Sequence, residues 1–154
     1  MAKISMIGAG TWGMSLASLL QKGGHEVTVW SAVEDEIISL KETRRVRNLP
    51  DLVLPPELLF TASLEEAMCG RDILVMAVPS IYVRETARRM APCCRFGQLV
   101  VNVAKGIEEA TLMTLSAILE EELPEANVAV LSGPSHAEEV SRGLPTSCVV
   151  GARN

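Results

Sequence analysis

The sequence has few side chains of the kind that bind metal ions. Its 154 residues include two histidines, His25 and His136, and four cysteines, none of which shows C-x-x-C spacing. The sequence therefore predicts no metal site. Neighbouring Cys93 and Cys94 would form a strained disulfide, so we expect structural or incidental cysteines in a compartment that keeps thiols reduced.

The sequence also has fewer basic than acidic side chains. The 14 lysines and arginines are outnumbered by 19 aspartates and glutamates, which gives a net charge of −5. This balance argues against nucleic acid or an anionic membrane as a partner, because either would require a basic face. Any anionic ligand must then be held by local groups.

Long apolar runs are missing as well. No stretch approaches the roughly 18 residues that a membrane-spanning helix requires, and Met1–Lys3 leads straight into a predicted strand. We therefore expect neither a transmembrane helix nor a signal peptide, and a cytoplasmic protein. With 48% hydrophobic residues, residues 1–154 can bury a core as one domain.

A glycine motif near the N-terminus organises the chain. A short apolar strand at 4–7 is followed by G-x-G-x-x-G at Gly8–Gly13 and by a helix with periodic apolar residues. Gly8 allows a tight exit from the strand, Gly10 lets the backbone approach a pyrophosphate, and Gly13 lets the helix pack closely. The helix N-terminus favours an anion by roughly 0.3 to 2 kcal/mol. The motif is weak evidence alone, but in this context it predicts dinucleotide binding.

Predicted strands and helices alternate along the rest of the chain. We expect strands at 4–7, 26–30, 60–61, 72–78, 98–103, 127–131 and 146–150, and helices at 14–20, 34–40, 63–68, 81–90, 112–119 and 137–141. The proline-marked stretch 44–59 is expected to be a loop with solvated arginines. This order predicts an α/β fold, a Rossmann-type doubly wound, mostly parallel sheet with helices on both faces.

Four loops should lie at the carboxyl edge of this sheet, where ligands bind. They are Gly8–Gly13, Pro79–Ser80, Lys105–Gly106 and Gly133–His136. Lys105 directly follows a strand, so we interpret it as a cation for a substrate oxygen or phosphate rather than a solvated lysine. Ser135 and His136 lack a G-x-S-x-G elbow and an orienting acid. A helix cap or a substrate hydrogen bond is therefore expected for Ser135, rather than hydrolase chemistry.

The tip of the second predicted strand bears on the choice of cofactor. An acidic residue there usually binds the adenosine ribose hydroxyls, and an arginine accommodates a 2′-phosphate. The tip reads Ser31-Ala32-Val33-Glu34-Asp35, and Glu26 lies at the other end of the strand, which leaves Glu34 as the candidate. An ordinary acid in the first turn of the next helix is an equally good interpretation of Glu34.

Five motifs together resemble the NAD(P)-dependent glycerol-3-phosphate dehydrogenases. They are Gly8–Gly13, Val78–Ser80, Lys105–Glu108, Leu131–Ser135 with Ala137, Glu139 and Val140, and Leu144–Thr146. They follow the family's order and cover the whole chain. The resemblance implies an oxidoreductase of glycerol phosphate metabolism and phospholipid biosynthesis, acting on a small-molecule phosphate, whose full-length form is a homodimer.

The resemblance also implies roles for individual residues. Together with Glu34, the expected cofactor-binding residues are Gly8, Gly10, Thr11, Trp12, Gly13, Pro79, Lys105 and the backbone at Ala137; the expected substrate-binding residues are Lys105, Gly133 and Ser135. Lys105 would contact both the cofactor and glycerol phosphate. It is the residue of this chain on which we expect the chemistry to depend.

Two features depart from the family pattern. Bacterial members commonly carry an arginine at the position of Ala32, so the usual 2′-phosphate partner is missing and we expect NAD to be preferred over NADP. The family's general base is a further lysine, which lies in a helical substrate domain that would follow residue 154. The resemblance therefore implies an N-terminal part that is inactive alone.

Three interpretations remain open at this stage. The first is the cofactor half of an oxidoreductase that interconverts glycerol 3-phosphate and dihydroxyacetone phosphate by hydride transfer. The second is a free-standing NAD-binding module that senses the cofactor without turnover. The third is a related dehydrogenase that acts on another hydroxy acid, which the lysine and Gly-Pro-Ser motifs disfavour.

Overall fold

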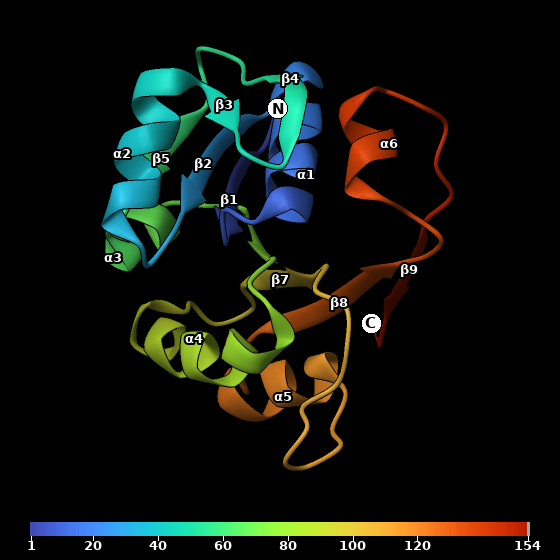
Figure 1. Ribbon diagram of the computed structural model, residues 1–154. Helices are drawn as coiled ribbons and strands as arrows, with labels where there is room; N and C mark the ends of the chain where they lie inside the picture. Colours follow the sequence, from blue (N-terminus) through green and yellow to red (C-terminus); the bar gives the residue numbers. More distant parts are fainter. Residues whose placement is uncertain (154) are drawn as a thin grey trace.

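A seven-stranded sheet forms the centre of the protein in a computed structural model that describes residues 1–153. The strand order is β5-β2-β1-β6-β7-β8-β9; all neighbours are parallel except β9, which runs antiparallel to β8 (Figure 1). The strands are β1 (Lys3–Ile7), β2 (Glu26–Trp30), β5 (Leu59–Thr61), β6 (Ile73–Met76), β7 (Leu99–Asn102), β8 (Asn127–Ser132) and β9 (Val149–Ala152). The predicted doubly wound, mostly parallel fold is confirmed.

The central parallel strands end at one level. Ile7 of β1 pairs with Trp30 of β2 and with Met76 of β6, and Met76 pairs with Asn102 of β7. The loops that follow these strands therefore start along the same carboxyl edge, where open α/β sheets form their ligand sites.

Helices cover both faces of this sheet. On one side lie α1 (Thr11–Lys22), α2 (Glu34–Thr43) and α6 (Ala137–Ser141); on the other lie α3 (Leu64–Met68), α4 (Val83–Met90) and α5 (Leu115–Glu122) (Figure 1). Two short 3₁₀ turns, η1 (Ser80–Tyr82) and η2 (Ala91–Cys93), flank α4. The two layers of helices bury separate apolar cores.

Alternate residues of the strands supply these two cores. Met6 and Met14 are fully buried on the α1 side, and Leu74 and Met76 are fully buried on the α4 side. Val75, between the last two, faces the α1 side. Burial on both faces explains the continuous apolar run of β6. Each fully buried side chain of this size contributes about 1.5–3 kcal/mol.

The stretch 44–59 was expected to be a loop, and this expectation is wrong. It contains a second, two-stranded sheet in which β3 (Arg45–Val46) pairs antiparallel with β4 (Leu49–Val53). Val46 and Leu49 are buried in the core on the α1 side, so packing against this core stabilises the hairpin.

Arg44 is a structural residue rather than a solvated one. It ends α2 with a left-handed φ of 52°, and its guanidinium donates to the Leu58 carbonyl oxygen at 2.7 Å. The guanidinium carbon also lies 5.2 Å from the centroid of the Phe60 ring. The neighbouring Arg45 and Arg47 are exposed, as expected.

The last large helix begins later than its apolar period predicts. Thr114 caps α5, since its Oγ1 accepts from the Ala117 N–H at 3.3 Å. Leu112 was expected on this helix but precedes it, with a φ of 60° and 73% of its surface exposed. Leu112 fits the period of Leu115 and Leu119 by spacing alone, so the prediction began the helix too early.

The last strand also lies further along the chain than the expected 146–150. It pairs with β8 from Val149 onward. Just before this strand the backbone passes close to Gly133: a Cβ added there would lie 2.7 Å from the Ser147 carbonyl oxygen. This close approach requires glycine at 133, where φ is 144°.

Candidate functional site

The turn between β1 and α1 places its three glycines in different kinds of space. At Gly8, φ is 123° and an added Cβ would lie 2.8 Å from the Ala77 carbonyl carbon. At Gly13 it would lie 2.6 Å from the Gly8 carbonyl oxygen, so close packing requires both glycines. At Gly10 it would meet nothing within 4 Å. The backbone at Gly10 is thus open to a ligand, at the N-terminus of a 12-residue helix whose first N–H groups have no helical partner.

A hollow of about 390 Å³ lies in front of this turn, and we call it the Lys105 hollow. Its lining comes from Gly10–Trp12, Ala77–Ser80, Ala104–Lys105 and Ser135–Ala137. The structure therefore brings together all four loops that the sequence places at the carboxyl edge. The volume falls within the roughly 300–1,000 Å³ of small-molecule sites.

The Lys105 ammonium is held by the loop that follows β8. Nζ donates to the carbonyl oxygens of Gly133 at 3.2 Å and Ser135 at 3.0 Å, and it lies 3.5 Å from Ser135 Oγ. It also lies 5.8 Å from the centroid of the Trp12 ring. An ammonium has three N–H groups, so the two carbonyl bonds leave one that a ligand oxygen can take over from the distant hydroxyl. Lys105 thus presents a fixed positive charge to the hollow.

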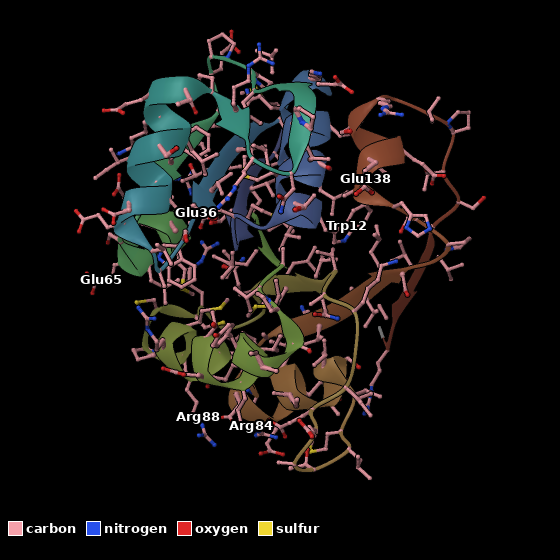
Figure 2. The ribbon with its side chains drawn as sticks, viewed as in Figure 1. Trp12, Glu36, Glu65, Arg84, Arg88 and Glu138 are labelled. Atoms are coloured by element: carbon pink, nitrogen blue, oxygen red, sulfur yellow. The ribbon has the colours of Figure 1, made fainter. Side chains whose placement is uncertain are left out.

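Trp12 and Ala137 are held in place by bonds to other elements. Trp12, labelled beside α1 in Figure 2, donates from Nε1 to the Val103 carbonyl oxygen at 3.0 Å. The hydroxyl of Ser15 on α1 donates to the Ala137 carbonyl oxygen at 2.9 Å, which fastens α6 to α1. With that carbonyl engaged, the N–H is the backbone group of Ala137 that a ligand could use.

An ion-pair network fixes the loop that carries Lys105. Arg84 of α4, labelled in Figure 2, donates from Nε and Nη2 to the two carboxylate oxygens of Glu108 at 2.7 and 2.9 Å. Its Nη1 donates to Glu121 and Glu122 of α5 at 2.7 and 2.6 Å. The Arg84 fork lowers the pKa of Glu108 to about 2. Because Glu108 lies three residues after Lys105, the network ties the Lys105 loop to both helices.

A second hollow, of about 450 Å³, lies on the other side of the glycine turn, and we call it the Glu36 hollow. It shares Gly10, Val78 and Pro79 with the Lys105 hollow, so the two spaces adjoin at Gly10. The tip of β2, Glu36 of α2 and side chains of α4 complete its lining. The molecule thus offers a two-part site whose middle is the open backbone of the glycine turn.

A family model described as the NAD-dependent glycerol-3-phosphate dehydrogenase N-terminus matches residues 3–154. The chain belongs to this family. Curated glycerol-3-phosphate dehydrogenases [NAD(P)+] of Agathobacter rectalis and Fusobacterium nucleatum are 53% and 51% identical to it, over 99% and 100% of the chain and 46% and 47% of the relatives. The chain therefore spans about half the length of these relatives.

A solved structure supports the same assignment. The glycerol-3-phosphate dehydrogenase of Coxiella burnetii superposes with a TM-score of 0.90 at 30% identity, over 99% of this chain and 47% of that one. The seven-stranded fold of this chain is thus the fold of the corresponding part of a glycerol-3-phosphate dehydrogenase.

Most residues expected for the glycerol-3-phosphate dehydrogenase site line the two hollows. These are Gly8, Gly10, Thr11, Trp12, Pro79, Lys105, Ser135 and Ala137. Gly13 and Gly133 lie behind the lining, where they allow close backbone packing. Ser135 does not cap α6, because His136 is the N-cap residue and makes no side-chain cap bond. The ligand contacts of all these residues remain predictions.

Glu34, the expected ribose partner, is not brought to either hollow. It is exposed in the first turn of α2, in agreement with the other interpretation of this residue, and Glu36 lines the second hollow instead. Residues two apart on a helix point to different sides, so the two acids cannot share one role. The sequence does not separate the two acids, because each lies four residues before an apolar residue, Ile38 for Glu34 and Leu40 for Glu36. Only the fold shows that Leu40 is buried and Ile38 exposed.

Proposed function

We propose that the chain binds a nicotinamide dinucleotide across both hollows, with the pyrophosphate against Gly10. The observation that carries this proposal is that the Lys105 hollow and the Glu36 hollow adjoin at Gly10, where the backbone is open and the α1 dipole favours an anion. The nicotinamide half would then lie toward Lys105 and the adenosine half toward Glu36. The names of the curated relatives specify NAD(P)+, and we propose NAD as the preferred cofactor with NADP binding more weakly.

We further propose that residues 1–154 are the dinucleotide-binding part of an oxidoreductase that interconverts sn-glycerol 3-phosphate and dihydroxyacetone phosphate. A bound nicotinamide would supply or accept the hydride. The fixed Lys105 ammonium beside Ser135 and Gly133 suits a phosphate or carbonyl oxygen of the substrate. The proton of the substrate hydroxyl needs a separate base, which the family resemblance assigns to a lysine outside this chain.

The remaining proposals concern partners and location. We propose a small-molecule phosphate as substrate, a homodimeric full-length enzyme, a cytoplasmic location, and neither nucleic acid nor membrane as partner. The four cysteines are free thiols, which suits a reducing compartment. Among residues 1–153, no helix combines the length and apolar character needed to cross a bilayer.

A Gly10→Val substitution tests the dinucleotide site. The valine side chain would project into the open space before the turn, so we expect NADH binding to weaken by at least about a hundredfold with the fold retained. Gly151→Val is the matched control, because a Cβ there also meets nothing within 4 Å and β9 lines neither hollow. Calorimetric titration measures both. Unchanged affinity in a folded Gly10→Val variant would remove the pyrophosphate from this turn.

A turnover assay tests whether residues 1–154 are the cofactor-binding part of the proposed oxidoreductase. We expect the 154-residue chain to bind NADH but not to reduce dihydroxyacetone phosphate, because loss of a positioned general base costs about 10²–10⁴ in rate and loss of the groups that orient the substrate costs more. NADH oxidation is followed by absorbance for this chain and for one extended to the length of its relatives. We expect turnover in the long chain only, and its loss in long Lys105→Ala.

The other outcomes separate the remaining interpretations. Activity in the short chain would place the base among residues 1–154. If neither chain reduces dihydroxyacetone phosphate but both bind NADH, a sensing module would be favoured. Turnover of a different hydroxy acid by the long chain, with none of glycerol 3-phosphate, would favour another dehydrogenase of the wider superfamily.

A further inference from the structure

The Glu36 hollow contains one anchored carboxylate and one free cation. We propose that Glu36 and Arg89 set the choice between NAD(H) and NADP(H): Glu36 accepts a hydrogen bond from the adenosine ribose and repels a 2′-phosphate, and Arg89 opposes that repulsion. This assignment rests on the proposed dinucleotide binding. Glu36 thus takes the role expected of Glu34, and the cation lies on α4 rather than at the tip of β2.

Glu36 is held so that one of its oxygens is free. The hydroxyl of Ser31, a buried residue directly after β2, donates to Glu36 Oε2 at 2.6 Å. The same hydroxyl oxygen accepts from the Val33 N–H at 3.1 Å, which fixes its orientation. The second carboxylate oxygen remains available at the lining of the hollow. The carboxylate is therefore positioned before any ligand arrives.

Arg89 is the cation that lines this hollow. Its guanidinium carbon lies 5.4 Å from the centroid of the buried Trp30 ring, and Arg89 forms no ion pair with any acid in residues 1–153. Arg84 and Arg88 on the same helix are paired with acids of α5. Arg89 thus keeps a weakly engaged, planar guanidinium at the hollow, which suits it to bind a phosphate or to stack on a base.

The arginines of the hairpin region do not compete for this role. Arg44 is engaged by the Leu58 carbonyl oxygen and the Phe60 ring, and Arg45 donates to the Pro50 carbonyl oxygen at 3.1 Å. Arg44, Arg45 and the exposed Arg47 all lie outside the lining of the Glu36 hollow. Any attraction for a 2′-phosphate at this site must therefore come chiefly from Arg89.

The charges that line the hollow determine the expected preference. Besides Glu36 and Arg89, Glu85 of α4 contributes a second carboxylate, so the side chains sum to one negative charge. A ribose 2′-hydroxyl can donate a hydrogen bond to Glu36, whereas a 2′-phosphate carries about −1.5 to −2 charges at pH 7 and is mainly a hydrogen-bond acceptor. NAD(H) should therefore bind more tightly, by about tenfold to a hundredfold.

Calorimetric titration of NADH and NADPH into four forms of the chain tests the assignment. In Glu36→Gln we expect weaker NADH binding, tighter NADPH binding, and a fall of about tenfold or more in the preference for NADH. In Arg89→Gln we expect NADPH binding to weaken more than NADH binding, so the preference rises. Asp35→Asn is the matched control: it removes one exposed charge from the same helix outside the lining, and both affinities should stay within about twofold.

The outcomes separate this assignment from the proposed function. If neither dinucleotide binds the wild-type chain, dinucleotide binding is wrong and this assignment fails with it. If NADH binds but Glu36→Gln leaves the preference unchanged, or Asp35→Asn shifts it equally, the assignment alone is wrong. Equal or tighter binding of NADPH by the wild-type chain would also overturn it. Circular dichroism of each variant confirms that the fold is intact.

Discussion

Two neighbouring loops face the Lys105 hollow, and different kinds of interaction hold them in place. The glycine turn after β1 is fixed by close backbone packing at Gly8 and Gly13, without an ion pair. The loop after β7 is fixed by charge, through the fork between Arg84 and Glu108. Where close packing holds a loop, an added methyl group should lower the stability of the protein, and pH should not alter this loss. Where an ion pair holds a loop, acid and salt should lower the stability.

The largest expected loss of stability comes from adding a side chain at Gly13. In Gly13→Val, the Cβ would lie 2.6 Å from the Gly8 carbonyl oxygen and 3.1 Å from the Ala77 Cβ. We expect a loss of about 1–3 kcal/mol or more in the free energy of unfolding, from overpacking. Urea denaturation measures it, and the loss should be equal at pH 7 and pH 5. Gly10→Ala, with open space at its Cβ, is the control and should retain its stability.

A smaller effect is expected from Glu108→Gln, and it should depend on pH. The folded pKa of Glu108, about 2, lies below its ordinary value of 4.5, so its contribution to stability is present above pH 4.5 and is lost as the pH falls toward 2. The variant should be less stable at pH 7 and lose less stability than the wild type over that range. Exposed Glu109 provides the control substitution, Glu109→Gln. Parallel pH profiles for wild type and Glu108→Gln would show that charge does not hold this loop.

The smallest effect on stability is expected at the contact between α1 and α6. Ser15→Ala removes the bond from Ser15 Oγ to the Ala137 carbonyl oxygen and should cost about 0.5–1.5 kcal/mol. Ser18→Ala is a matched control on the same helix, because the Ser18 hydroxyl is buried without a partner and its loss should be neutral or stabilising. Hydrogen exchange should accelerate in α6 for the first variant alone. If hydrogen exchange in α6 is equally fast in both variants, other contacts hold α6 against α1.

Much of the fold followed from the sequence because burial determines where apolar residues lie along each strand and helix. The apolar run at 72–78 identified the central strand β6, observed at Ile73–Met76. The rule that loops meet at the carboxyl edge predicted that Lys105 and Ser135 would lie at the same edge, where they line one hollow. The hairpin at 45–53 was missed because Pro50 reads as a loop signal, although an edge strand tolerates proline.

The parts of the site that escaped prediction depend on helix phase and on distant partners. Glu36 and Glu34 have the same chemistry, and only the rotation of α2 about its axis separates them. Arg84 and Glu108 are 24 residues apart, on different elements. No local pattern in a single sequence indicates that two such side chains meet.

The distribution of tryptophan gives this protein a built-in optical readout. The chain has two tryptophans; Trp12 borders the Lys105 hollow and Trp30 borders the Glu36 hollow. The Trp12 ring lies beside an ammonium, and the buried Trp30 ring lies beneath a guanidinium. Because each indole borders a different hollow, we expect variants with a single tryptophan to report ligand binding at one hollow at a time, without an added dye.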